Sequence, residues 1–223
     1  MDKIITSIEV QKNNPQRINI FINHEFAFGI SKFVGAWLQV GQNLDEEKIS
    51  NLKREDSEEV AFQKLIRFIS YRPRSEDEII NRLIRFGFDD GVIEKVIVKL
   101  KEAGLAGDYQ FAHEWVENRI TFRPRSHKLL TMELRSKKID EEIIQRIIGG
   151  IPSDEELALK AALKVSHKYE TLDYSTFKKK LSGFLTRRGF NYSIVNEVCE
   201  NLWEVKNIEN DMSQQNEKLI THE

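Results

Sequence analysis

The sequence is poor in the residues that mark several classes of protein. It has a single cysteine, Cys199, so no internal disulfide is expected, and its Cys and His residues lack metal-site spacing. A reducing compartment is therefore expected, and we interpret Cys199 as a small buried apolar residue. No long hydrophobic run occurs, and the start MDKIITSIEV contains an early acidic residue, so we expect neither a signal peptide nor a membrane span. These absences predict a cytoplasmic protein.

Sequence signs of catalysis are also missing. No glycine-rich phosphate loop follows a predicted strand, no nucleophile elbow is present, and the five histidines show no common pattern. We therefore predict no catalytic residues, no bound metal or cofactor, and no small-molecule substrate. The segment 206–223 has few apolar residues and no core pattern, which predicts a disordered polar tail.

Charge is nearly balanced over the chain, with a formal net charge of −2, but it is unevenly distributed. Acidic residues dominate 45–59, whereas basic residues dominate 120–138 and 178–188. An uneven distribution is typical of an interaction surface, although each cluster also fits an ordinary solvated helix face.

The first fifty residues show the pattern of β-strands. Apolar residues alternate with period two within 4–10, 18–22 and 26–30, which predicts three short strands. Asn13-Asn14-Pro15 is expected to form the first turn, and Asn23-His24-Glu25 fits a tight hairpin. The segment KFVGAWLQVGQNL fits either a further strand or a short helix, and DEEKISNLKRED predicts a helix that leads onward. We predict a strand-rich module with a linker helix over residues 1–50.

The rest of the chain contains an internal repeat. The segments SYRPRSEDEIINRL, from Ser70, and TFRPRSHKLLTMEL, from Thr121, are offset by 51 residues and share an aromatic residue, Arg-Pro-Arg-Ser and a helical pattern. The same offset of 51 residues relates Gly87 to Lys138 in the second copy and Lys138 to Gly189 in a third copy. Three copies are predicted, over residues 57–106, 107–151 and 153–205.

Each copy divides into three short helices at its start and stop signals. Pro73 ends one helix and Ser75 begins the next, and Pro124 and Ser126 repeat this arrangement. N-cap residues are predicted at Ser57, Ser75, Asp89, Asp108, Ser126, Asp140, Ser153 and Asn191, with capping boxes at Ser75–Glu78 and Ser153–Glu156. The predicted fold is mainly α, with three tandem three-helix repeats in an elongated arrangement behind a small strand-rich module.

The Arg-Pro-Arg-Ser segments place arginines at turns between helices. In one interpretation these side chains compensate a helix dipole or pair with a nearby acid. In the other they contact an acidic protein surface or a phosphate chain, for which the planar guanidinium is well suited. The candidate partner-binding residues are the basic side chains of the turns and of the two basic clusters: Arg72, Arg74, Arg123, Arg125, Lys128, Arg135, Lys137, Lys138, Lys178, Lys179, Lys180, Arg187 and Arg188.

Three segments carry a resemblance to a known family. RPRSEDEIINRL, GLAGDYQFA from Gly104 and LTRRGFNYSIV from Leu185 resemble the repeat signatures of the RecX family, bacterial regulators of the RecA recombinase. The similarity covers about residues 57–205. It implies three-helix units in an elongated molecule that lodges in the groove of the RecA filament on single-stranded DNA. It also implies that RecA and its filament are the partners, with weak contact to single-stranded DNA, and that strand exchange and ATPase activity are modulated, usually inhibited.

The sequence also departs from that family. Many short members lack the strand-rich front module or build it differently, so its role stays open. The slightly acidic net charge favours a protein partner over bare DNA. Two alternatives remain: an autonomous nucleic-acid-binding protein, since KKKLSGFLTRRGF could lie along phosphates, and a helical scaffold without nucleic acid.

Overall fold

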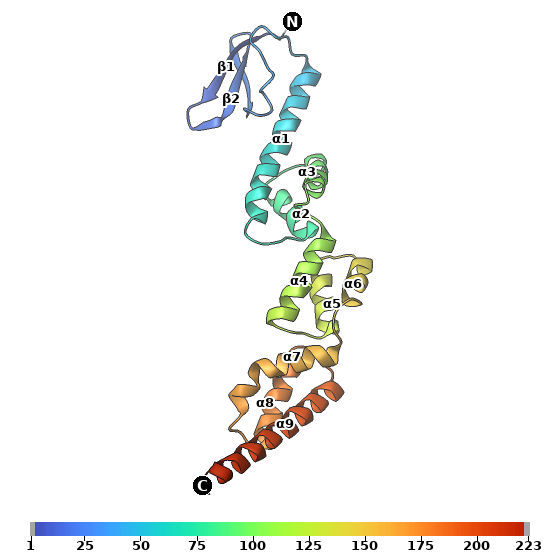
Figure 1. The fold of residues 1–223 in the computed structure, drawn as a ribbon. Coiled ribbons are helices and arrows are strands. Elements are labelled where there is room, and N and C mark those ends of the chain that lie inside the picture. The colour runs from blue at the N-terminus through green and yellow to red at the C-terminus, as the bar shows by residue number, and fades with distance from the viewer. Residues whose placement is uncertain (1–2, 221–223) are drawn as a thin grey trace. The chain divides into compact units, whose positions relative to one another are not determined.

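A computed structural model of the chain divides into two compact units, unit 1 (Met1–Gly107) and unit 2 (Asp108–Glu223). The structure describes residues 3–220, and the side chains of residues 3–208 (Figure 1). Unit 1 contains an antiparallel sheet and three helices, and unit 2 is entirely helical in its described part.

The sheet of unit 1 has three strands, as predicted, in the order β1-β2-β3: β1 Ile5–Gln11, β2 Asn14–Ile22 and β3 Glu25–Ser31. The first turn lies at residues 12–13, so the prediction that Asn14 and Pro15 belong to it is wrong. Asn23 and His24 connect β2 to β3 with positive φ angles of 51° and 69°, which matches the right-handed twist of a tight hairpin and confirms the predicted turn. For residues 32–44 the sequence fitted either a strand or a short helix, but the segment forms turns. They bury Val34, Leu38 and Leu44 against the sheet.

Helix α1, Glu46–Ile69, joins the sheet to the first repeat without a break. Asp45 caps its start, and neither glycine nor proline occurs within it, so nothing ends the helix near residue 57. Ser57 is therefore an interior residue, and its prediction as an N-cap is wrong. Repeat 1 consists of α1 from about residue 57, α2 (Glu76–Arg85) and α3 (Asp90–Glu102), which share their own apolar core.

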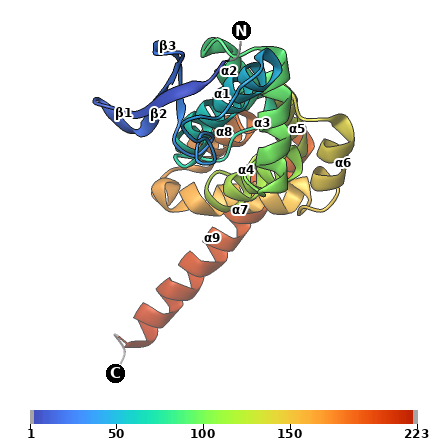
Figure 2. The same ribbon diagram turned by 90° about the horizontal axis from the view of Figure 1, so that it is seen from above.

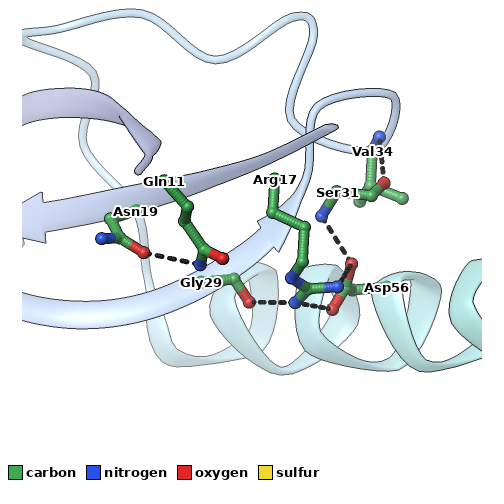
Figure 3. Close-up of polar contacts among 7 residues, drawn as sticks. All are labelled: Gln11, Arg17, Asn19, Gly29, Ser31, Val34 and Asp56. Carbon is green, nitrogen blue, oxygen red and sulfur yellow. Dashed lines mark hydrogen bonds and ion pairs between the residues drawn. The ribbon is translucent and has the colours of Figure 1, made fainter. Parts of the chain in front are cut away.

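A polar network fixes the sheet to α1 (Figure 3). The Asp56 carboxylate accepts hydrogen bonds from the Ser31 amide, at 2.6 Å, and from the Arg17 guanidinium, at 2.8 Å. The same guanidinium donates to the Gly29 carbonyl at 3.0 Å. Because Asp56 is buried and fully paired, it links the edge of β3 to the middle of α1.

Unit 2 holds repeats 2 and 3. Repeat 2 consists of α4 (Asp108–Phe122), α5 (His127–Ser136) and α6 (Glu141–Ile148). Repeat 3 consists of α7 (Asp154–Ser166), a 3₁₀ turn (His167–Tyr169), α8 (Tyr174–Thr186) and α9 (Tyr192–Ile220). One continuous apolar cluster runs through both repeats, from Phe111 of α4 to Cys199 of α9. The two repeats therefore share a core.

The predicted caps are largely confirmed. Side chains of Ser75, Asp89, Ser126, Asp140 and Ser153 accept hydrogen bonds from backbone amides at the starts of their helices, and Ser153 and Glu156 form the capping box. Asn191 accepts from the Ser193 amide at 2.9 Å. In repeat 3, Asp173 begins α8 in place of the serine of the other two repeats.

Helix α9 departs from the predicted disordered tail at 206–223. It continues to Ile220 and extends alone beyond α7 and α8 (Figure 2), while residues 221–223 lie outside the described part. Glycine and proline are absent between 192 and 220, so the local sequence supports the helix without a core. Along residues 3–220, no helix combines the length and the apolar character needed to cross a membrane.

Candidate partner-binding site

The two Arg-Pro-Arg-Ser segments form the turns α1–α2 and α4–α5. In each turn the helix ends before the proline, and the serine caps the following helix with its side chain fully buried. Ser75 accepts from the Glu78 amide at 3.3 Å and Ser126 from the Leu129 amide at 3.2 Å. Since each serine side chain is held inside, the flanking arginines are left at or near the surface.

The first arginine of the motif behaves differently in the two turns. Arg72 donates to both carboxylate oxygens of Glu78 at 3.0 Å and to the Pro73 carbonyl at 2.9 Å, so it holds its own turn together. In repeat 2 the residue that corresponds to Glu78 is Leu129. Arg123 is accordingly exposed, and its side chain has no hydrogen bond or ion pair within the described residues.

The second arginine of repeat 1 belongs to a group of cations and aromatic rings. We call this group the arginine stack; it consists of Lys64, Phe68, Arg74, Arg82 and Phe86. The Arg74 guanidinium lies 3.9 Å from the centre of the Phe68 ring, and that of Arg82 lies 5.3 Å from the same ring. Burial, followed by the charge of Arg72, lowers the pKa of Arg74. The charge of Glu78, which pairs with Arg72, partly opposes this lowering, but no carboxylate forms an ion pair with Arg74 or Arg82 among the described residues.

Repeat 2 carries a different group at the corresponding positions. The residues that lie 51 positions after those of the arginine stack form a group that we call the Glu133 cluster: Trp115, Arg119, Arg125, Glu133 and Lys137. Glu133 accepts from the Trp115 indole at 2.8 Å and from Arg119 Nε at 3.0 Å, and it also pairs with Arg125. Arg125 is therefore an internal ion-pair partner, which supports the structural interpretation of this residue.

Four arginines gather where repeats 2 and 3 meet: Arg123, Arg125, Arg187 and Arg188, the junction arginines. The Ser126 amide donates to the Arg188 carbonyl at 3.0 Å, which ties the α4–α5 turn to the end of α8. Burial is the largest cause of a lowered pKa at Arg188, followed by the charges of Arg125, Arg187 and Arg123. Arg187 is exposed and, like Arg123, makes no ion pair in the described part. The junction can therefore offer guanidinium groups to an acidic ligand.

The remaining candidates divide into paired and exposed side chains. Arg135 donates two hydrogen bonds to Glu141, at 2.9 and 2.7 Å, and this pair lowers the pKa of Glu141 to about 2. Lys178 lies 3.3 Å from a Glu200 oxygen. Lys137 and Lys180 lie over the rings of Trp115 and Tyr169. Three exposed lysines have no ion pair within residues 3–208: Lys128, Lys138 and Lys179.

Several residues of these groups escaped the sequence analysis. Phe68, Arg82, Trp115 and Glu133 were not proposed as site residues. Trp115 does pack against the core, but its indole also holds Glu133. Applied to charged positions as well as apolar ones, the offset of 51 residues aligns Arg82 with Glu133. This change of charge between the repeats could have identified both residues from the sequence.

Comparison with known proteins places this geometry in a family. Four family models match in order: the regulatory protein RecX N-terminal domain at residues 3–45, and the first, second and third RecX three-helix domains at residues 61–100, 108–147 and 153–199. Together they cover the sheet and all three repeats.

Individual relatives agree. The regulatory protein RecX of Bacillus velezensis is 31% identical over 222 residues, covering 98% of this chain and 83% of the relative. That of Clostridium botulinum is 28% identical over 202 residues, covering 88% and 94%. A crystal structure of regulatory protein RecX is 26% identical with a TM-score of 0.67, covering 90% of this chain and all of the other. RecX from Lactobacillus salivarius, 22% identical with a TM-score of 0.55 over 66% of this chain and 97% of the other, shares the fold.

Proposed function

The chain belongs to the RecX family of regulatory proteins, and on that premise we propose that it binds RecA and the RecA filament on single-stranded DNA. The proposed effect is inhibition of strand exchange and ATP hydrolysis, through which the protein regulates recombination and DNA repair in the cytoplasm. The observation that carries the proposal is the ordered match of four family domains along the chain.

The exposed junction arginines support a role in binding. Arg123 and Arg187 make no ion pair in the described part of the chain, so their charges contribute little to folding, about 0 to 1 kcal/mol even for a typical exposed pair. Arginine is enriched in protein interfaces and can bind a carboxylate through two parallel hydrogen bonds. These two side chains are therefore better candidates for partner contact than Arg125, which is held by Glu133.

The test is a titration of the protein into RecA that is hydrolysing ATP on single-stranded DNA. We expect the rate to fall as the protein is added, and a flat trace at excess protein would refute the proposal. A double variant, Arg123→Glu with Arg187→Glu, should bind the filament about 30-fold more weakly, because arginine contacts in an interface are worth about 2 kcal/mol or more. Lys12→Glu with Lys32→Glu, exposed charges of the sheet module, makes the same change in net charge and serves as control.

A second candidate function, binding of nucleic acid without RecA, is favoured by one observation. The junction gathers four arginines, and among the described side chains only Glu133 pairs with one of them, which also suits a phosphate chain. Tight binding of an oligothymidine at physiological salt without RecA would favour this alternative. In that case neutralising each junction arginine should reduce the slope of log affinity against log salt by about 1.

A further inference from the structure

The arginine stack of repeat 1 has donors that no part of the described chain uses. Neither Arg74 nor Arg82 makes an ion pair or a side-chain hydrogen bond among residues 3–208, and the Nε atoms of both are buried without an acceptor. A buried donor without an acceptor is costly, and native structures contain few of them. The described chain therefore supplies no acceptor for either guanidinium group.

Repeat 2 shows what satisfies this arrangement. At the position of Arg82 it has Glu133, whose carboxylate accepts from the indole of Trp115 and from Arg119 and pairs with Arg125. Arg125 corresponds to Arg74, so the same turn arginine binds a carboxylate in one repeat and has none in the other. In repeat 1 the substitution of arginine for the acid removes the internal anion and adds a second cation.

We propose that the arginine stack of repeat 1 is a binding site for an acidic side chain, aspartate or glutamate, of the protein partner. The partner's carboxylate would lie between Arg74 and Arg82 as Glu133 lies between Arg119 and Arg125. The aromatic rings of Phe68 and Phe86 hold the two guanidinium groups in place, which reduces the entropy lost on binding. The identity of the partner as RecA rests on the proposed function, whereas the acidic chemistry of the ligand rests on the stack.

A carboxylate fits this site better than a nucleic-acid phosphate. Residues 57–106 contain nine Lys and Arg and nine Asp and Glu, so repeat 1 as a whole is neutral. Binding to a nucleic-acid backbone depends on several basic residues that displace counterions together. A neutral surface with one pair of free guanidinium groups is better matched to a single acidic side chain.

The decisive variant is Arg82→Glu, which places in repeat 1 the residue that repeat 2 already uses. The new carboxylate can pair with Arg74, so the fold should be kept and the melting temperature should not fall, while the site is closed from within. Binding to the RecA filament should weaken at least about 30-fold, because an acidic partner would then meet an occupied site and a like charge. Lys12→Glu, with the same change in charge, should bind like the parent. Arg82→Met, which keeps the apolar stem over the rings, tests the site without adding an acid.

A second measurement separates this inference from the proposed function. The Nε–H signals of Arg74 and Arg82 are followed by nuclear magnetic resonance while hexaglutamate or an oligothymidine is added to the parent protein. We expect hexaglutamate to shift both signals and the oligothymidine to leave them unchanged. If the parent fails to bind RecA while hexaglutamate shifts the signals, the proposed function fails and the site stands. The inference is overturned if hexaglutamate shifts neither signal or if the oligothymidine shifts both. It is also overturned if the parent binds RecA filaments and the Arg82→Glu variant binds them equally well.

Discussion

At the scale of single residues, the same backbone conformation recurs once in each repeat. Gly87, Lys138 and Gly189 follow the second helix of their repeats with φ angles of 82°, 61° and 87°. Glycine adopts this left-handed conformation without cost, whereas other residues lose about 1 to 2 kcal/mol. Lys138 adopts this conformation despite its cost, so the fold of the repeat requires a left-handed residue at this position.

The two glycines should respond differently to alanine. A Cβ atom on Gly87 would meet nothing within 4 Å, so Gly87→Ala should cost only the conformational term, about 1 to 2 kcal/mol. A Cβ atom on Gly189 would lie 2.5 Å from Ser126 Oγ and 2.9 Å from Leu129 Cβ. Gly189→Ala should therefore lose at least about 1 kcal/mol more, because overpacking disturbs the α5 cap. Urea unfolding of both variants measures the difference, and equal losses would contradict it.

At the scale of elements, α1 serves both the sheet and repeat 1, and Asp56 is where the sheet is attached (Figure 3). Asp56→Ala should lower the free energy of unfolding by about 2 to 3 kcal/mol, since it leaves the Ser31 amide and the partly buried Arg17 guanidinium without their shared acceptor. Hydrogen exchange should speed up mainly in β1 to β3.

The control is Asp45→Ala on the same helix. Asp45 is exposed and pairs only with the Lys48 amide and ammonium at the helix start, so its loss should cost less stability than the loss of Asp56 and leave exchange in the sheet nearly unchanged. Equal effects of the two variants on the sheet would mean that the Asp56 network does not hold it.

The elements also show which features the sequence could reveal. Helix starts depend on a local acceptor, so caps such as Asp89 and Asp140 were predictable from spacing alone. Ser57 failed because a cap residue begins a helix only where the preceding chain is not already helical, and α1 starts at Glu46. The arginine stack and the Glu133 cluster depend on tertiary contacts between helices. The repeat offset relates Arg82 to Glu133, but the sequence does not show which side chains each of them contacts.

At the scale of the whole molecule, acidic side chains at or near helix starts link folding to pH. The pKa values of Asp45, Glu141, Glu155 and Asp173 are lowered. The causes named first are hydrogen bonds: from the Lys48 amide at Asp45, from Arg135 at Glu141, from its own backbone at Glu155, and from the Thr176 side chain at Asp173. Each lowered pKa favours the folded state as long as the carboxylate is ionised.

The sign of the pH dependence follows from those shifts. The ordinary values are 3.8 for Asp and 4.5 for Glu, and Glu141 falls to about 2 in the folded protein. The stabilisation is therefore complete above about pH 4.5 and is lost as the pH falls towards 2. Three of the four carboxylates lie in unit 2, so hydrogen exchange at pH 3 should rise in α5 to α8 before it rises in unit 1. Arg135→Gln should reduce the loss of stability between pH 4.5 and 2.5, because Glu141 then has less to lose on protonation. A urea midpoint that stays constant over this interval in the parent would contradict the argument, as would exchange that rises first in the sheet.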